Sequence, residues 1–376
     1  MDSLLLILSV FAYVSWFAVL ALPWRPWLHT ETLEPDEGQG VCDLSDLTVL
    51  IPARNEAEVI AETLGALAGQ GSGLKIVLVD DGSDDGTAKL AQEVRGVDLQ
   101  VLTGQALPPG WSGKLWALEQ GSQEIQTAWT LLLDADIQLK PGMIAALLDK
   151  ARQDRRSCVS VMARLRMESC WEKLLMPAFI YFFKLLYPFR LSNSDFPYVA
   201  AASGGCVLLE TRLIGEIGGF AAIKGALIDD CALAARIKQA GNRIWIGQSH
   251  AVVSNRPYEQ LEPIWEMVAR SAYTQLCYSG WLLGLCTLLM LALFVGPLLA
   301  IAWGDGNALA ASAVAYACMV ASYWPTLSYY QRTGAWAWLL PVIAALYLAM
   351  TWTSAIRYWR GDRGRWKNRV YSVEEA

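Results

Sequence analysis

The sequence predicts an α/β domain with a mostly parallel β-sheet flanked by helices, held to a membrane by apolar helices at both ends. Short apolar, strand-like runs alternate with amphipathic helical segments between residues 31 and about 270, where the charge density is that of a globular domain. Outside this region lie almost uncharged apolar stretches of about 20 residues, the length that crosses a bilayer as a helix. They are residues 4–22, 281–303, 308–327 and 335–356.

The chain of 376 residues, 54% of them apolar, therefore divides into three expected segments. We predict an N-terminal membrane anchor (1–30), a soluble domain (31–270) and a C-terminal transmembrane region with a basic tail (271–376). A retained anchor fits better than a cleaved signal peptide, because residues 1–3 carry no basic side chain. Arg25 follows the first span, so the positive-inside rule places the soluble domain in the cytoplasm.

The basic tail conflicts with a simple count of the spans. Three C-terminal spans after a cytoplasmic domain would put the tail outside, whereas its basic residues favour the cytoplasmic side. These residues are Arg357, Arg360, Arg363, Arg365, Lys367 and Arg369. We give the basic residues more weight, so that either one apolar segment is re-entrant or an earlier surface helix crosses the membrane.

Composition excludes several classes of function. A formal net charge of −6 provides no basic surface for nucleic acid, so we expect no nucleic-acid partner. The eight Cys are scattered without zinc-ligand spacing and fit buried, reduced thiols. Because the chain has only His29 and His250, a histidine metal site or a Ser-His triad is not expected.

Strand and helix signals follow one another regularly along the soluble domain. Buried, β-branched runs at 47–51 and 75–79 predict parallel strands, and further strand signals occur at 99–102 and 130–133. Amphipathic helices are predicted between the strands and at 143–151. This alternation predicts a parallel sheet with helices on both faces, in which ligands bind at the carboxyl ends of the strands.

Three polar clusters fall at such strand ends, and their convergence on one edge is the main functional prediction. Pro52–Glu56 follows the first strand, Asp80–Asp81 the second, and Asp134–Asp136 the run at 130–133. Two carboxylates one residue apart can share a hard divalent cation and leave positions open for a phosphate-bearing ligand. Each cluster also has an ordinary interpretation, as a turn or helix cap for the acids and as an ion pair for Arg54 and Glu56.

Other polar features lie beside or outside these clusters. Asn55 fits the N-cap of the first helix. Lys114 lies in a Pro/Gly-rich loop and fits either a phosphate contact or a solvated loop cation. Asp229 and Asp230 open a helical stripe, and the residues alone favour a helix cap over a catalytic pair. The aromatic and basic segment at about 171–191 is interpreted as an interfacial helix in the headgroup zone, with a buried core helix as the alternative.

In their order along the chain, these motifs resemble those of the family-2 glycosyltransferases of GT-A fold. The matching segments are Val49–Glu56, Val79–Thr87, Gly113–Leu118, Asp134–Asp136, Ile217–Phe220 and Ile228–Asp230. The resemblance covers about residues 47–250. Leu107–Trp116 and Asn255–Tyr258 are similar to the hopene-associated glycosyltransferases, which are linked to hopanoid synthesis. The tail at 366–371 is similar to that of membrane lipid glycosyltransferases.

The resemblance implies transfer of a sugar from a nucleoside diphosphate sugar to an acceptor hydroxyl. It assigns a divalent cation, Mn²⁺ or Mg²⁺, to Asp136 with Asp134, where it would neutralise the departing diphosphate. The residues assigned to the nucleotide sugar are Pro52, Arg54, Glu56, Asp80, Asp81, Lys114 and Asp134. A carboxylate that accepts from an imide N–H favours uracil, which makes a UDP-sugar the expected donor. Asp230 would be the general base beside Asp229, and inversion is expected because no separate nucleophile is in evidence.

The expected function is therefore that of an integral membrane glycosyltransferase, in the bacterial inner membrane, that adds a single sugar to a lipid. Hopanoid or another polyisoprenoid is the expected acceptor class. Processive polysaccharide synthases of the family carry Gln-x-x-Arg-Trp, which is missing here near Trp265 and Arg270. A small polysaccharide synthase and a catalytically silent scaffold with a nucleotide-binding fold remain the alternatives, although intact Asp136 and Asp230 argue against the scaffold.

Overall fold

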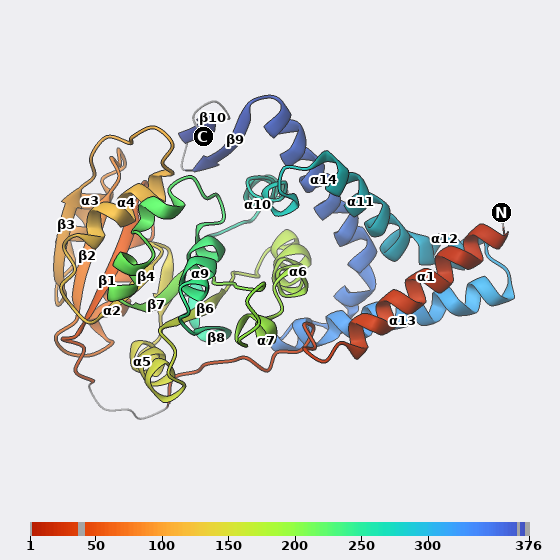
Figure 1. The fold of residues 1–376 in the computed structure, drawn as a ribbon, viewed down its shortest axis with the longest axis horizontal. Helices are drawn as coiled ribbons and strands as arrows, with labels where there is room; N and C mark the ends of the chain where they lie inside the picture. The colour runs from red at the N-terminus through yellow and green to blue at the C-terminus, as the bar shows by residue number, and fades with distance from the viewer. Residues whose placement is uncertain (1, 37–41, 367–368, 373–376) are drawn as a thin grey trace. The chain divides into compact units, whose positions relative to one another are not determined.

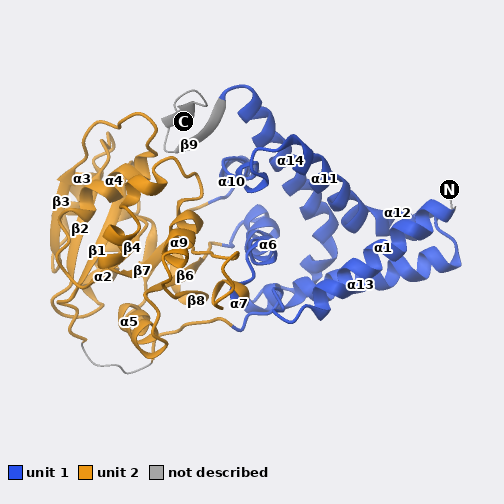
Figure 2. Ribbon diagram, viewed as in Figure 1, with its two compact units in different colours: residues 1–30, 167–190, 258–364 blue, residues 31–166, 191–257, 365–376 orange. Residues whose placement is uncertain are grey.

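The structure, a computed structural model, describes residues 2–36, 42–366 and 369–372 (Figure 1). Packing divides the chain into two compact units, each built from separate stretches of sequence (Figure 2). Unit 1 comprises residues 1–30, 167–190 and 258–364, and unit 2 comprises residues 31–166, 191–257 and 365–376. Each unit is described by itself.

The two units do not follow the three consecutive segments expected from the sequence. Residues 167–190 and the start of 258–364 fall within the expected soluble domain (31–270), yet they pack with the apolar helices of unit 1. The functional boundaries at 30 and 270 stay a prediction. Lys367 of the basic tail lies outside the described residues.

Unit 2 is built on an eight-stranded sheet with the strand order β3-β2-β1-β4-β7-β6-β8-β5. The strands are β1 (Leu47–Ala53), β2 (Lys75–Asp80), β3 (Asp98–Thr103), β4 (Trp129–Leu133), β5 (Ile137–Leu139), β6 (Cys158–Arg164), β7 (Cys206–Glu210) and β8 (Ile244–Ser254). Strand β1 pairs in parallel with β2 and β4, β2 with β3, and β6 with β8. Strand β7 runs antiparallel to both β4 and β6, and β5 is antiparallel to β8. The expected mostly parallel sheet is confirmed, but the reversed strand β7 was not anticipated.

Helices cover both faces of this sheet, which explains why its central strands are mostly apolar, without regular polar alternation. The helices are α2 (Ile60–Ala68), α3 (Thr87–Glu93) and α5 (Met143–Gln153) on one face, and α4 (Gly113–Ser122), α8 (Arg212–Glu216) and α9 (Asp229–Gln239) with the 3₁₀ turn η1 (Phe220–Ile223) on the other. Val49 and Ile51 of β1 belong to the first core and Leu50 to the second, and all three are fully buried. A strand buried on both faces needs no polar alternation.

Unit 1 contains four helices long and apolar enough to cross a bilayer, which confirms one N-terminal and three C-terminal candidate spans. They are Ser3–Ala21, Gly280–Trp303, Gly306–Tyr329 and Gly334–Trp359. Their elements are α1 (Asp2–Ala21), α11 (Gly280–Met290), the π-helical η3 (Leu291–Val295), α12 (Gly296–Trp303), α13 (Gly306–Tyr329), η4 (Gly334–Leu339) and α14 (Leu340–Trp359). Helix α1 runs beside α13 (Figure 1). The remaining elements are α7 (Phe189–Ser192), η2 (Thr274–Leu276), β9 (Asp362–Trp366) and β10 (Arg369–Ser372).

Helix α6 (Cys170–Leu186) is the segment expected at the membrane surface, and it packs against α13 and α14 within unit 1. The hydroxyls of Tyr181 and Ser322 are 2.6 Å apart, and the Tyr347 hydroxyl donates to the carbonyl of Leu175 at 2.9 Å. One side of α6 is therefore buried among apolar helices. Its position in the headgroup zone stays a prediction.

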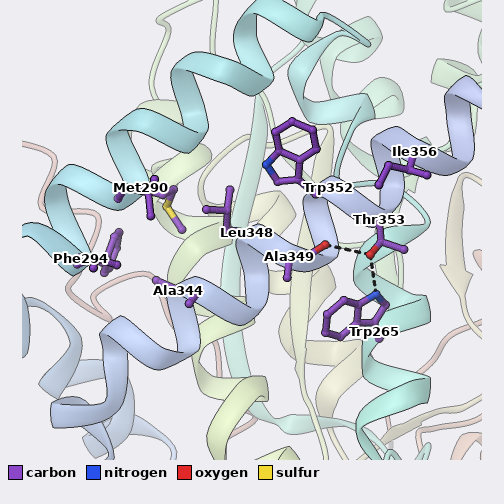
Figure 3. A pocket seen from close by; sticks show the side chains of 12 residues that line it. Trp265, Met290, Phe294, Ala344, Leu348, Ala349, Trp352, Thr353 and Ile356 are labelled. Atoms are coloured by element: carbon purple, nitrogen blue, oxygen red, sulfur yellow. Dashed lines mark hydrogen bonds between the residues drawn. The ribbon is translucent and has the colours of Figure 1, made fainter.

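Unit 1 also contains an open apolar pocket of about 430 Å³ between α10 (Leu261–Ala269), η3 and α14 (Figure 3). Trp265 of α10 donates its indole N–H to Thr353 Oγ1 at 3.1 Å, and Thr353 Oγ1 donates to the carbonyl of Ala349 at 3.0 Å. Met290 and Leu348 point into the same space (Figure 3). Because the Thr353 hydroxyl is already engaged by Trp265 and Ala349, the wall offers mainly hydrocarbon surface.

Candidate active site

Strand direction determines which loops of unit 2 share one edge of the sheet. Strands β1, β2 and β4 are parallel, so the segments after Ala53, Asp80 and Leu133 leave the sheet on the same side. Strand β7 is antiparallel to β4 and to β6, and β8 is parallel to β6. The start of β7 at Cys206 and the end of β8 at Ser254 therefore lie at that same edge.

Lys114 is the centre of a charged cluster at this edge. Its Nζ lies 2.9 Å from Asp134 Oδ1 and 3.2 Å from Asp229 Oδ2, and only 18% of its side chain is exposed. A small cavity of about 10 Å³ is lined by Lys114, Asp134, Asp229 and Asp230 together with Pro52. The structure thus brings together residues from three of the predicted motifs and the acidic pair that opens α9.

The environment of Lys114 differs from the flexible loop that the sequence suggested. Lys114 lies in the first turn of α4, where the Ser112 side chain caps the helix by accepting from the Leu115 N–H at 3.3 Å. Leu115 and Leu118 are buried against the sheet, which holds this turn in place. A helix anchored in this way fixes the direction of the ammonium group better than a solvated loop would.

Asp230 is held by backbone donors on both oxygens. Gly204 N–H donates to Oδ2 at 2.8 Å, and Cys231 N–H donates to Oδ1 at 2.7 Å. Gly204 belongs to the loop before β7, and a Cβ placed there would lie 3.0 Å from Lys114 Nζ and 3.4 Å from Asp230 Oδ2. The glycine therefore allows backbone to approach the charged cluster closely.

A second group of charges surrounds Arg256, to which the sequence analysis gave no role of its own. Arg256 Nε donates to Asp136 Oδ2 at 2.8 Å, and its Nη2 donates to Glu56 Oε1 at 2.8 Å and Oε2 at 3.1 Å. Ser254 Oγ also donates to Asp136 Oδ2, at 3.4 Å. The sequence signal for Arg256 was its position just after a strand, β8. Its place at this edge could not be predicted, because it depends on the antiparallel direction of β7.

Arg54 and the acidic residues after β2 form a third group. Arg54 Nη1 donates to the backbone carbonyl of Asp81 and lies 3.7 Å from Asp81 Oδ2. Asp81 is buried, and Asp80 accepts a hydrogen bond from the Ser83 hydroxyl. Arg54 and Glu56 thus take part in separate ion pairs, Arg54 with Asp81 and Glu56 with Arg256, which the sequence did not indicate.

Asn55 does not cap the first helix, contrary to expectation. Helix α2 begins at Ile60, with Val59 at the N-cap position. Asn55 adopts a left-handed backbone conformation (φ 51°), and its side chain accepts from the Asp84 N–H at 3.1 Å. Its own N–H donates to Ser83 Oγ at 3.0 Å, so Asn55 ties the loops after β1 and β2 together.

The electrostatics of the Lys114 cluster favour a proton on Asp230 at higher pH than usual. Burial, and then the charge of Asp229, raises the pKa of Asp230 to about 6, although Lys114 and two N–H donors act in the opposite direction. Burial also raises the pKa of Asp134, opposed by Lys114. Burial lowers the pKa of Lys114, but Asp134 and Asp229 outweigh it and raise the pKa overall. A carboxylate with a pKa near neutrality is suited to accept a proton.

The acidic motif fits a cation whose coordination is completed by water or by substrate phosphates. Among residues 2–36, 42–366 and 369–372, no group of three or more His, Cys, Asp or Glu could hold a metal ion. Mg²⁺ is commonly bound by one or two carboxylates together with substrate phosphates and water. Asp134 and Asp136 supply two such carboxylates, and the donor set is chemically suitable for Mg²⁺ or Mn²⁺ on a diphosphate.

The sheet and its acidic edge define a GT-A-like α/β fold. A solved structure with this fold is the mannosyltransferase PcManGT from Pyrobaculum calidifontis, in complex with GDP-Man and Mn²⁺. It superposes with a TM-score of 0.60 and 18% identity over 94% of this chain and 99% of that chain. At this identity the likeness concerns the fold.

The sequence of the sheet region matches a known family. Residues 48–218 match the description Glycosyl transferase family 2, so this part of the chain is similar to the family-2 glycosyltransferases. The 4,4'-diaponeurosporenoate glycosyltransferase of Staphylococcus haemolyticus is 30% identical over 117 residues, which are 31% of each chain. An undecaprenyl-phosphate 4-deoxy-4-formamido-L-arabinose transferase of Pectobacterium atrosepticum is 32% identical over 136 residues, 35% of this chain and 41% of the relative. The chain thus spans about a third to two fifths of the length of these curated relatives.

Proposed function

We propose that the protein is a membrane-bound glycosyltransferase that moves a single sugar from a nucleoside diphosphate sugar to a lipid acceptor. The observation that carries this proposal is the placement of Lys114 between Asp134 of the acidic motif and Asp229 of the pair that includes Asp230. The donor-side and acceptor-side residues expected from the sequence thereby meet in one small cavity that Pro52 also lines.

The donor side follows from the residues at the ends of β1, β2 and β4. We propose that Asp81, held by Arg54, and Asp80 accept hydrogen bonds from the nucleoside, and that the nucleotide is UDP. Asp136 and Asp134 would hold Mn²⁺ or Mg²⁺, which supplies Lewis-acid neutralisation of the departing diphosphate. The Lys114 ammonium adds a fixed positive charge beside Asp134. The Mn²⁺ bound to the mannosyltransferase of the same fold supports this assignment.

On the acceptor side, Asp230 takes the proton of the acceptor hydroxyl. The acceptor oxygen forms its bond to the anomeric carbon while the bond to the diphosphate breaks, and the electron pair leaves with the nucleoside diphosphate. This direct displacement inverts the anomeric centre. The N–H groups of Gly204 and Cys231 hold Asp230 in place, and Asp229 raises its proton affinity.

The lipid acceptor is supported by the candidate spans and by the relatives. Unit 1 carries four helices able to cross a bilayer, and the Pectobacterium relative is an undecaprenyl-phosphate sugar transferase. We propose a polyisoprenoid acceptor, with a hopanoid as one candidate, and a location in the bacterial inner membrane. The charge asymmetry around the first span, with Arg25 after it, supports a cytoplasmic position of the catalytic domain.

The deciding experiment measures release of the nucleoside diphosphate in membranes that contain the protein. A panel of UDP- and GDP-sugars is supplied with Mn²⁺ or Mg²⁺ and a total lipid extract, and the labelled product is identified. We expect release by the unmodified protein and by Asp154→Asn, a control at an i,i+4 ion pair with Lys150, but not by Asp136→Ala or Asp230→Asn. Release in all four proteins that does not exceed the background of membranes without the protein would leave only the catalytically silent scaffold, and a polymeric product would favour the polysaccharide synthase.

A further inference from the structure

Arg256 connects two acidic side chains that the sequence analysis placed in different parts of the donor site. Its Nε donates to Asp136, and its Nη2 donates to both oxygens of Glu56. The side chains of Asp136 and Glu56 are only 13% and 11% exposed. A planar guanidinium with donors in two directions fixes the orientation of both carboxylates, which a lysine ammonium cannot do in the same way.

The contacts on Asp136 leave one of its oxygens available. Arg256 Nε and Ser254 Oγ both donate to Oδ2, and within the described part of the chain the hydrogen bonds and the ion pair of the Asp136 side chain fall on this oxygen alone. A carboxylate held by one oxygen presents the other in a defined direction. Outer hydrogen-bond partners orient metal-binding side chains in this manner, and their loss typically weakens metal affinity by about 10- to 100-fold.

We propose that Arg256 is a positioning residue for the divalent cation. It holds Asp136 by Oδ2 so that Oδ1 is the oxygen offered to the cation, and Glu56 in turn holds Arg256. This inference rests on the cation-dependent function proposed above. It assigns Glu56 to the support of Asp136 rather than to direct contact with the nucleotide.

A test must separate orientation from charge. Arg256 repels a divalent cation and Glu56 attracts it, so a single substitution at either position changes both effects together. The double variant Glu56→Gln/Arg256→Gln removes one charge of each sign and leaves the net charge unchanged. Its matched control is Arg212→Gln/Glu216→Gln, which removes an exposed ion pair from the same unit.

Binding of Mn²⁺ alone to the full-length protein is measured by electron paramagnetic resonance of the free ion. We expect the Kd for Mn²⁺ to rise by about 10- to 100-fold in the Glu56/Arg256 double variant and to stay unchanged in the Arg212/Glu216 control. Arg256→Lys, which keeps the charge and most of the volume, is expected to restore only part of the affinity. Thermal unfolding of each variant verifies that the protein is folded.

The outcomes distinguish this inference from the proposed function. Mn²⁺ affinity that is unchanged or higher in the folded double variant, together with loss of binding in Asp136→Ala, would overturn the positioning role alone. If the double variant does not fold, full Mn²⁺ affinity in Arg256→Lys would overturn it equally. Unchanged affinity in Asp136→Ala, or no binding by the unmodified protein, would overturn the cation site and the inference with it.

Discussion

The pH dependence of Asp229→Asn provides a quantitative test of the charged cluster. The rise in the pKa of Asp230 from 3.8 to about 6 corresponds to roughly 3 kcal/mol of preference for the protonated form. Burial is the largest cause and the Asp229 charge the second. The contribution of Asp229 is therefore smaller than that of burial, and its side chain is 23% exposed, so that water screens its charge in part. We assign about one pKa unit to the Asp229 charge, which is roughly 1.4 kcal/mol.

The assay is the pH profile of kcat/KM for nucleotide release, whose acid limb reports the base in the free enzyme. In the unmodified protein the activity should fall as the pH drops through about 6, because Asp230 becomes protonated. Removal of the Asp229 charge favours the ionised form of Asp230, so the limb should move down by about one pH unit. The acid limb should stay above pH 3.8, because the Asp230 side chain remains buried in the variant. An acid limb that stays in place or moves up would refute the assignment of Asp230 as the base.

Two further predictions concern the same cluster. Lys114→Met should move the acid limb to higher pH, because Lys114 lowers the pKa of Asp230. The same variant should reduce the free energy of unfolding at pH 8 by about 3 kcal/mol, because Asp134 loses its partly buried ion-pair partner. Thermal unfolding should show a smaller loss at pH 5, below the pKa of about 6 of Asp230, because the protonated carboxyl no longer needs the Lys114 charge. An equal loss at both pH values would contradict this. Gly204→Ala should lower kcat/KM by roughly 10- to 100-fold with little change in Tm, because the added Cβ lies within 3.4 Å of Lys114 Nζ and Asp230 Oδ2. Gly65→Ala, where a Cβ meets nothing within 4 Å, is its control, and equal activity of the two variants would argue against a tight site at Gly204.

The sequence was informative where local pattern determines structure. The buried runs at 47–51 and 75–79 became β1 and β2, because continuous apolar, β-branched segments have few alternatives to a strand buried on both faces. Parallel strands of this kind end at one edge, so the convergence of Asp81 and Asp134 on that edge followed from the same pattern.

Long-range geometry was not accessible in the same way. The run at 207–209 indicates a strand but not its direction, and only the antiparallel pairing of β7 brings Gly204 and Arg256 to the site. Arg256 and Asp136 are 120 residues apart in sequence, and no local periodicity links them. Lipid and other helices can bury the apolar face of the helix predicted at 171–191 equally well, so the sequence does not determine which of them surrounds it.

The alternation of the chain between the two units has a consequence for synthesis and for protein engineering. Helix α6 leaves the ribosome before β7 and β8, and long before α13 and α14, against which it packs. Its apolar side must therefore be sheltered by lipid or by a chaperone while the sheet still lacks two strands. A truncated protein ending at residue 270 would keep α6 and lose both packing partners, so an excised catalytic fragment would precipitate unless α6 is redesigned.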